Sequence, residues 1–222
     1  MTWVRLYLTV EGETERTFAE RTLKPHLAQF SVDVRPSIVL TNRKLGTRGG
    51  GLIYARIEKD IRNRMKEDPN AEARFSTMLD LYALPADFPG HEDAAKESVP
   101  ARKAACLEQA LSARLADPRF LPYLQLHEFE ALLYCDLAEL ERRIEGLSLK
   151  RLKAETAGLP PEEINEREES APSRRLVGCI PRYQRLKVRV GALAAAAIGL
   201  PVLREKCPHF NDWLTRLEKL AA

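Results

Sequence analysis

The sequence predicts an α/β fold: a mostly parallel sheet of about four strands flanked by helices, with a helical C-terminal extension. Up to residue 136, segments with the two-residue period of strands alternate with segments that have the helical period. This alternation is typical of parallel sheets, because each crossover between parallel strands carries a helix. After residue 136 only helical patterns recur. We therefore expect an α/β domain over residues 1–136 and a helical extension over 137–222 that packs on it.

The first three elements are a strand, a helix and a second strand. Alternating apolar residues predict a strand over 3–10. Apolar residues three and four apart then predict a helix that runs to about residue 30, in which Pro25 predicts a kink or an early end. The second strand is expected over 32–40, where Pro36 favours the edge of the sheet because proline cannot donate a ladder hydrogen bond.

The later elements continue the alternation. After a glycine-rich loop over 41–51, the patterns predict a helix over 52–65, an apolar and therefore central strand over 75–84, a helix beginning at Pro100, a strand over 120–126 and a helix from His127 to Tyr134. In the extension, residues 137–157 have a charged helical pattern, and an amphipathic helix is expected over about 210–220.

The composition is that of an ordinary soluble globular protein, with 45% hydrophobic and 30% charged residues. A net charge of +3 is too small to indicate nucleic-acid binding by itself, so a basic surface has to be local. The four cysteines have no CxxC spacing, which excludes zinc ribbons and thioredoxin-type chemistry and favours a reducing cytoplasm. No signal peptide is expected, and glycines and a proline interrupt the apolar run at 190–203, so we expect no membrane span.

Acidic residues gather where the predicted strands end. Glu11 follows the first strand, Asp80 lies in the third, and Glu128 and Glu130 follow the fourth, next to His127. In an open parallel sheet, ligands bind beyond these carboxyl ends. Carboxylate oxygens suit Mg²⁺ or Mn²⁺, which take one or two carboxylates together with water and phosphate oxygens. Such a metal would support phosphodiester cleavage.

Structural roles compete with this interpretation. Glu13 and Glu15 lie in a first helical turn, where the helix dipole favours acids. His127 fits a hydrogen-bonded core histidine as well as a ligand. Asp80 is harder to explain structurally, because it interrupts an apolar strand and a buried charge needs a partner or a metal.

Several motifs add a family resemblance to this interpretation. The opening at Val10–Glu15 looks like that of Toprim domains, especially those of the OLD-type nucleases. The wider set resembles a bacterial Toprim-like family, the domain of unknown function 4276, and it covers almost the whole chain. The segments that carry this resemblance are Val10–Glu15, Thr77–Tyr82, Leu84–Gly90, His127–Leu133, Ala171–Arg175 and Cys207–Phe210.

The resemblance implies roles for individual residues. Glu11 matches the Toprim glutamate, a general acid/base or metal ligand, and Asp80 matches the first aspartate of the Toprim Asp-x-Asp motif. Tyr82 stands in place of the second aspartate, which puts a two-metal arrangement in doubt. Glu128 or Glu130 would replace the missing carboxylate, or the site has lost its activity.

The resemblance also implies a function. It favours a Mg²⁺- or Mn²⁺-dependent nuclease acting on DNA or RNA, in a phage-defence or repair module with an ABC-type ATPase partner. The alternative is a catalytically inactive regulatory or binding subunit of such an ATPase. A small-molecule phosphatase or phosphotransferase ranks last, because the sequence has neither a nucleotide-cradling motif nor an Asp-x-Asp-x-Thr nucleophile.

Two basic segments are candidates for binding the nucleic-acid backbone. The C-terminal segment from Ser170 to Arg204 has no acid and six basic residues before Arg204 itself, and such a run can contact phosphates. A solvated helix face, or pairing with the acids of 162–169, explains it equally simply. The candidate phosphate contacts are Arg43, Lys44 and Arg48 in the glycine-rich loop, and Ser173, Arg174, Arg175 and Lys187 in the C-terminal segment.

Overall fold

A computed structural model describes residues 2–39, 53–164 and 170–222. It confirms an α/β fold with a parallel sheet. The strands are β1 (Val4–Val10), β2 (Val32–Ile38), β3 (Ala73–Asp80), β4 (Phe120–Leu121) and β5 (Leu124–Gln125). Their order is β2-β1-β3-β4, with β5 also paired to β3, and every pairing among the described residues is parallel. β2 lies at the edge of this sheet, as Pro36 predicts.

The predicted fourth strand is divided into two short strands. Pro122 stands at the break and has no backbone N–H to donate. The hydroxyl of Thr77 takes over both ladder bonds there: Oγ1 donates to the carbonyl of Tyr123 and accepts from its N–H, each at 2.9 Å. The third strand also ends earlier than predicted, at Asp80, where a 3₁₀ turn over Leu81–Ala83 follows.

The first helical segment continues past Pro25. It consists of α1 (Glu13–Phe18), a π turn (Ala19–Leu23), α2 (Lys24–Leu27) and a final 3₁₀ turn that ends at Phe30. The predicted early end is therefore wrong. The wide π turn ends at Leu23, and Pro25 lies in the first turn of α2, where its missing backbone donor disturbs the preceding helical hydrogen bonds.

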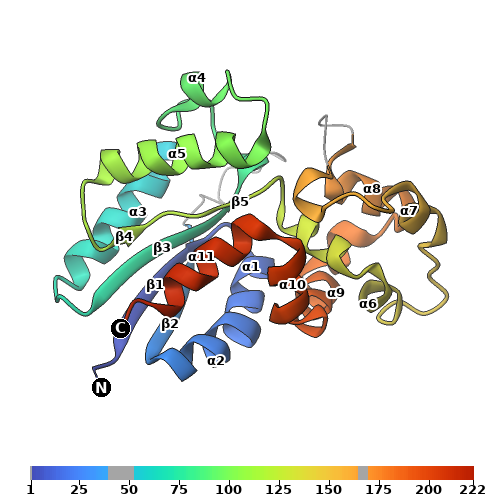
Figure 1. Ribbon diagram of the computed structural model, residues 1–222, viewed down its shortest axis with the longest axis horizontal. Coiled ribbons are helices and arrows are strands. Elements are labelled where there is room, and N and C mark those ends of the chain that lie inside the picture. The colour runs from blue at the N-terminus through green and yellow to red at the C-terminus, as the bar shows by residue number, and fades with distance from the viewer. Residues whose placement is uncertain (1, 40–52, 165–169) are drawn as a thin grey trace.

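Helices cover both faces of the sheet. Residues of α3 (Tyr54–Glu67) and α5 (Pro100–Leu115) pack on one face in a cluster with Phe75 and Leu79. On the other face, the inward residues of β1 pack with α1, α2, α10 (Leu200–Lys206) and α11 (Pro208–Glu218). Figure 1 shows α5 on one side of the strands and α11 on the other.

Trp213 attaches α11 to the sheet. Its indole Nε1 donates to Ser76 Oγ of β3 at 3.0 Å, and its ring stacks on Tyr123 at a centroid distance of 4.2 Å. The contact with Ser76 spans 137 residues of sequence, and α11 is part of the main core.

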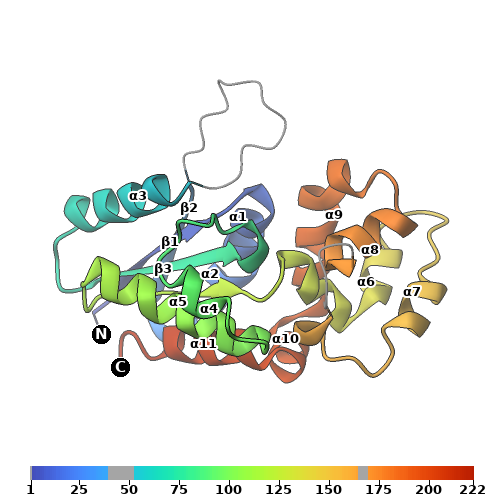
Figure 2. The same ribbon diagram turned by 90° about the horizontal axis from the view of Figure 1, so that it is seen from above.

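The remaining helices form a lobe beyond the carboxyl ends of the strands (Figures 1 and 2). They are α6 (Leu137–Glu141), α7 (Lys150–Glu155), α8 (Pro172–Cys179) and α9 (Tyr183–Ile198); a short α4 (His91–Ala94) lies over α5. The predicted helix over 137–157 is two short helices, and the helix predicted from His127 is a 3₁₀ helix over Phe129–Cys135. Leu140 and Leu176 of the lobe belong to the same core cluster as β1.

No single described helix is long and apolar enough to cross a membrane. α9 and α10 pass that test only when taken together, and they are bent by 84° relative to each other.

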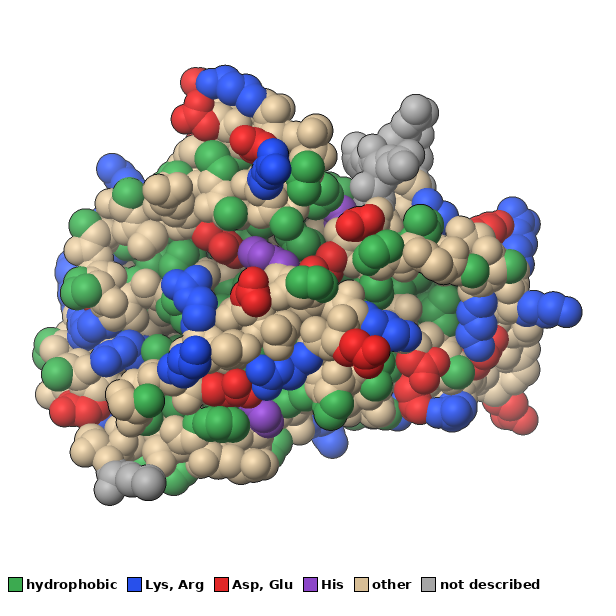
Figure 3. Space-filling view, viewed as in Figure 1, with side chains coloured by type: hydrophobic (Ala, Val, Ile, Leu, Met, Phe, Trp, Pro, Cys, Tyr) green, Lys and Arg blue, Asp and Glu red, His purple; other side chains and the backbone are tan. Residues whose placement is uncertain are grey.

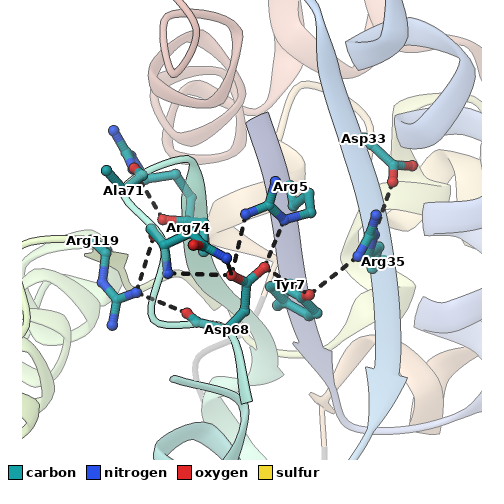
Figure 4. A network of polar contacts seen from close by, with 10 residues as sticks. Arg5, Tyr7, Asp33, Arg35, Asp68, Ala71, Arg74 and Arg119 are labelled. Carbon is teal, nitrogen blue, oxygen red and sulfur yellow. Dashed lines mark hydrogen bonds and ion pairs between the residues drawn. The ribbon is translucent and has the colours of Figure 1, made fainter. Parts of the chain in front are cut away.

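A polar network ties the strands together at their amino ends (Figure 4). The carboxylate of Asp68 accepts from Arg5 Nε at 2.6 Å and from the Tyr7 hydroxyl at 3.0 Å. Arg119 donates to the backbone carbonyl of Asp68 at 2.9 Å. The hydrogen bond from Arg5 holds the pKa of Asp68 below its ordinary value.

We expect Asp68→Asn to lower the free energy of unfolding at pH 7 by about 1.5–3 kcal/mol, because charge-assisted hydrogen bonds to Arg5 are lost. A depressed carboxyl pKa stabilises the folded state above the unfolded-state pKa of about 4, and this contribution disappears as the pH falls through the folded-state value. Urea unfolding of wild type and Asp68→Asn, at pH 7 and at a pH below the folded-state pKa of Asp68, measures the difference in free energy of unfolding. Asp33→Asn, in the more exposed pair with Arg35, is the control and should cost much less.

Candidate active site

The ends of β1 and β3 bring Glu11 and Asp80 together. β1 and β3 are neighbours, with Val10 paired to Met78, so the residues that follow them lie side by side. Glu11 Oε2 accepts from the backbone N–H of Asp80 at 3.3 Å. Asp80 Oδ1 in turn accepts from the backbone N–H of Phe129 at 2.9 Å. Asp80 therefore joins the ends of two strands to the start of the 3₁₀ helix.

Two more acids and one base complete the cluster. The first turn of α1 carries Glu15 and the 3₁₀ helix carries Glu130, and both are buried. Lys187 reaches the cluster from α9, with Nζ 3.5 Å from Glu130 Oε1. Within the described part of the chain, four carboxyl groups thus surround a single ammonium group. We call Glu11, Glu15, Asp80, Glu130 and Lys187 the carboxylate cluster.

The cluster opens into a cavity of about 240 Å³. Its lining includes half of the predicted site residues, namely Glu11, Asp80, Tyr82, Glu128, Glu130, Ser173 and Lys187, together with Ala83 and Gln184. Sequence reasoning missed Gln184. It precedes Lys187 by one helical turn, and this spacing on a helix was the available signal.

Crowding and burial favour the protonated forms of these acids. Burial, and then the neighbouring charge of Glu15, raises the pKa of Glu11 to about 7. Burial also raises the pKa of Asp80, and Glu11 and Glu15 raise it further. Burial alone would lower the pKa of Lys187, but the carboxylates, Glu130 first, raise it above its ordinary value. Lys187 therefore stays protonated, and its one positive charge is too little to neutralise the carboxylates around it.

Glu128 has a structural task at the mouth of the cavity. Its two carboxylate oxygens accept from the backbone N–H and the hydroxyl of Ser173, both at 2.9 Å. Ser173 lies in the first turn of α8, and the helix dipole at this end also stabilises a nearby carboxylate. Glu128 therefore holds α8 against the strand ends, and Glu130 is the acid that faces the cluster.

Tyr82 and His127 form a pair at one side of the cavity. The Tyr82 hydroxyl lies 2.9 Å from His127 Nδ1, and His127 Nε2 lies 2.8 Å from the carbonyl oxygen of Glu162. His127 is buried, and burial lowers its pKa. Its backbone has a φ of 62°, a left-handed conformation that is uncommon for histidine. Both ring nitrogens thus have partners within the chain, and the hydrogen bonds fix this residue in place.

The structure separates the candidate phosphate contacts. Arg43, Lys44 and Arg48 lie outside the described residues. Ser173 is bonded to Glu128, and Arg175 Nε donates to the carbonyl of Ser170 at 2.8 Å, whereas Arg174 is exposed on α8. Of the four candidates that the structure describes, Lys187 is the one that forms an ion pair with the carboxylate cluster. The acid run of 162–169 is described only as far as residue 164, and Glu162 is buried there.

Among residues 2–39, 53–164 and 170–222, no group of three or more His, Cys, Asp and Glu side chains is arranged as a ready metal cage. Glu11 and Asp80 each keep carboxylate oxygens beyond those bonded to backbone N–H groups. A cation held by these two groups would keep several waters, which is the ordinary coordination of Mg²⁺.

Comparison with known families decides where this chain belongs. A family model described as Domain of unknown function (DUF4276) matches residues 10–218. This chain is a member of the DUF4276 family. The match runs from the last residue of β1 to the last residue of α11, so the DUF4276 region contains the whole carboxylate cluster. Neither the curated proteins nor the solved structures include one that matches the chain.

Proposed function

We propose that this DUF4276 chain is a Mg²⁺- or Mn²⁺-dependent, Toprim-like nuclease that hydrolyses phosphodiester bonds of DNA or RNA. The observation that supports this proposal is the unbalanced charge of the carboxylate cluster: among the described residues, the buried Glu15, Asp80 and Glu130 and the half-buried Glu11 share the one ammonium group of Lys187. Buried carboxylates of this kind need protons or a cation. A bound divalent cation would supply the positive charge that these carboxylates need beyond that of Lys187.

Glu11 and Asp80 are the groups that would hold the metal, with Glu130 behind them. When bound, the metal supplies an activated water and stabilises the leaving oxygen. Without the metal, burial and then Glu15 raise the pKa of Glu11 to about 7, and a bound cation would favour its carboxylate form. Lys187 stays positively charged at the same cavity and can pair with a phosphate oxygen.

Nucleic acid would approach over α8 and α9. Arg174 is exposed on α8, and Ser173 and Lys187 line the cavity. The four free thiols fit a reducing compartment, so we expect the protein to act in the cytoplasm. The resemblance to Toprim domains adds the expectation of an ABC-type ATPase partner in a phage-defence or repair module.

A catalytically inactive regulatory subunit is the second candidate. Two observations favour it: the Tyr82 hydroxyl is bonded to His127, at the position where the Toprim resemblance implies a second aspartate, and the ammonium group of Lys187 already pairs with Glu130. Such a subunit would keep the fold and bind its ATPase partner without binding a divalent metal.

Calorimetry with Mn²⁺ separates the two candidates. We expect the wild-type protein to bind Mn²⁺, and we expect Glu11→Gln to weaken binding by about a hundredfold, because one of two ligand carboxylates is lost. Glu13→Gln is the matched control, since Glu13 lies two residues away on α1 with an exposed side chain. A wild-type protein that binds no Mn²⁺ at millimolar concentration would favour the inactive subunit.

A further inference from the structure

A second, larger cavity of about 890 Å³ lies apart from the candidate active site. Its walls are the start of α5, the segment 156–163 after α7, and the junction of α10 with α11. Its described lining shares no residue with the cavity of the carboxylate cluster. The proposed nuclease function therefore leaves it unused. Cavities of this size are typical of binding sites.

Apolar side chains form the floor and the rim of this cavity. Leu126 and Tyr134 are buried in its floor. Val99 and Leu159 lie at its rim with 44% and 48% of their surfaces exposed, although both are large apolar residues. Apolar side chains exposed around a cavity are typical of surfaces that bind another molecule.

The bases that line the cavity are occupied within the chain. Lys153 pairs with Glu141, and Lys206 Nζ donates to the carbonyl of Cys135 at 2.7 Å. His209 Nε2 lies 3.1 Å from both Glu108 Oε1 and the carbonyl of Leu124. Each of these three basic side chains thus already has an acid or a backbone carbonyl of the chain as its partner.

The acids of the rim have no such partners. Glu163, Glu205 and Asp212 line the cavity, are exposed, and form no ion pair with any residue of the described part of the chain. Figure 3 shows this face, where acidic side chains and a histidine lie among apolar side chains between α5 and α11. A ligand for this cavity should therefore combine apolar groups with positive charge.

The wall between the cavity and the core is held rigidly. The buried carboxylate of Glu162 accepts from the backbone N–H groups of His209 and Phe210, at 3.0 and 3.1 Å. Pro160 and Pro161 restrict the segment that precedes it. The shape of the cavity is consequently formed before a ligand binds, which lowers the entropic cost of binding.

We propose that this cavity is the docking site for a short segment of a partner protein that presents an apolar side chain flanked by lysine or arginine. The apolar anchor would enter between Val99 and Leu159, and the flanking cations would face Glu163, Glu205 and Asp212. The exposed acids disfavour a nucleic-acid backbone at this position. The proposal does not depend on the metal site, because the two cavities have different linings.

Selection of random dodecapeptides displayed on phage, with the wild-type protein immobilised, tests this proposal. We expect enriched peptides to share an apolar residue flanked by lysine or arginine. Synthetic copies should bind Leu159→Asp, and the double variant Glu205→Lys with Asp212→Lys, about tenfold or more weakly than wild type, because anchor contacts and rim charges are lost. Glu67→Lys, with its exposed side chain on α3 outside the cavity, is the charge control and should bind like wild type.

Three results would overturn the docking proposal: no enrichment, enrichment of acidic peptides, or peptides that bind the cavity variants as tightly as wild type. Leu159, Glu205 and Asp212 are exposed, so these variants should fold, and thermal melting checks this. Mn²⁺ binding measured on the same variants should be unchanged, which separates this result from the outcome at the carboxylate cluster.

Discussion

Replacing Asp80 with asparagine is expected to lower metal-dependent cleavage of nucleic acid by about a hundredfold or more, because one of two ligand carboxylates is removed. The substitution keeps the shape of the side chain. Its amide oxygen can still accept from the backbone N–H of Phe129, as Asp80 does at 2.9 Å. The loss should therefore come from the missing charge and not from a rearranged strand end.

The stability of this variant should change in the opposite direction from its activity. Burial and then Glu11 raise the pKa of Asp80, so the folded protein binds protons more tightly than the unfolded chain does. Stability must then fall as the pH rises from the unfolded pKa of about 4 toward the raised folded value. Asparagine does not ionise, so without metal Asp80→Asn should melt no lower than wild type, and relatively higher at pH 8 than at pH 5.

Cleavage assays on plasmid DNA, single-stranded DNA and RNA with Mn²⁺ or Mg²⁺ measure the first effect. Glu11→Gln should lose activity with Asp80→Asn, whereas the exposed control Glu13→Gln should keep it. Wild-type cleavage that survives in both Glu11→Gln and Asp80→Asn would show that the carboxylate cluster is not the active site.

Trp213→Ala is expected to lower the free energy of unfolding by about 3–5 kcal/mol, the usual cost of truncating a buried tryptophan. Trp213 is 2% exposed, stacks on Tyr123 and donates to Ser76 Oγ. The variant would leave a cavity between α11 and the sheet and would remove the hydrogen bond that Ser76 Oγ accepts, although this hydroxyl would still donate to the carbonyl of Leu121. Since α11 shares the core of β1, the whole chain should unfold in one transition at lower urea concentration.

Trp3→Ala is the matched control for Trp213→Ala, because Trp3 is 51% exposed and lies immediately before β1. It should change the free energy of unfolding by less than about 1 kcal/mol. Two separate transitions in the wild-type protein would contradict the prediction, since α11 and the sheet would then unfold independently. Fluorescence and circular dichroism followed together distinguish these outcomes.

Local sequence pattern predicted much of the sheet and half of the site. The alternation of Val4, Leu6, Leu8 and Val10 identified β1, and its end placed Glu11 beside Asp80 because neighbouring parallel strands end at one edge. Pro122 was a visible signal for the break between β4 and β5, but the hydroxyl of Thr77 that fills the gap depends on tertiary packing.

The contribution of the lobe to the site could not be read from sequence in the same way. Lys187 was identified as a base that would contact phosphate, yet its approach to Glu130 depends on how α9 packs beyond the strands. Likewise, Glu128 and Glu130 are separated by one residue, and only the turn between them decides that one holds Ser173 while the other faces the cluster.

The contact of Trp213 with Ser76 and Tyr123 has a consequence for synthesis on the ribosome. The strands emerge early, but α11, which covers this part of the sheet, is translated long after them. At ordinary translation rates, the interval between the synthesis of β1 and that of α11 is on the order of ten to forty seconds. During that interval the nascent chain presents an uncovered apolar sheet face, and the cell has to protect it from aggregation until the C-terminal helix arrives.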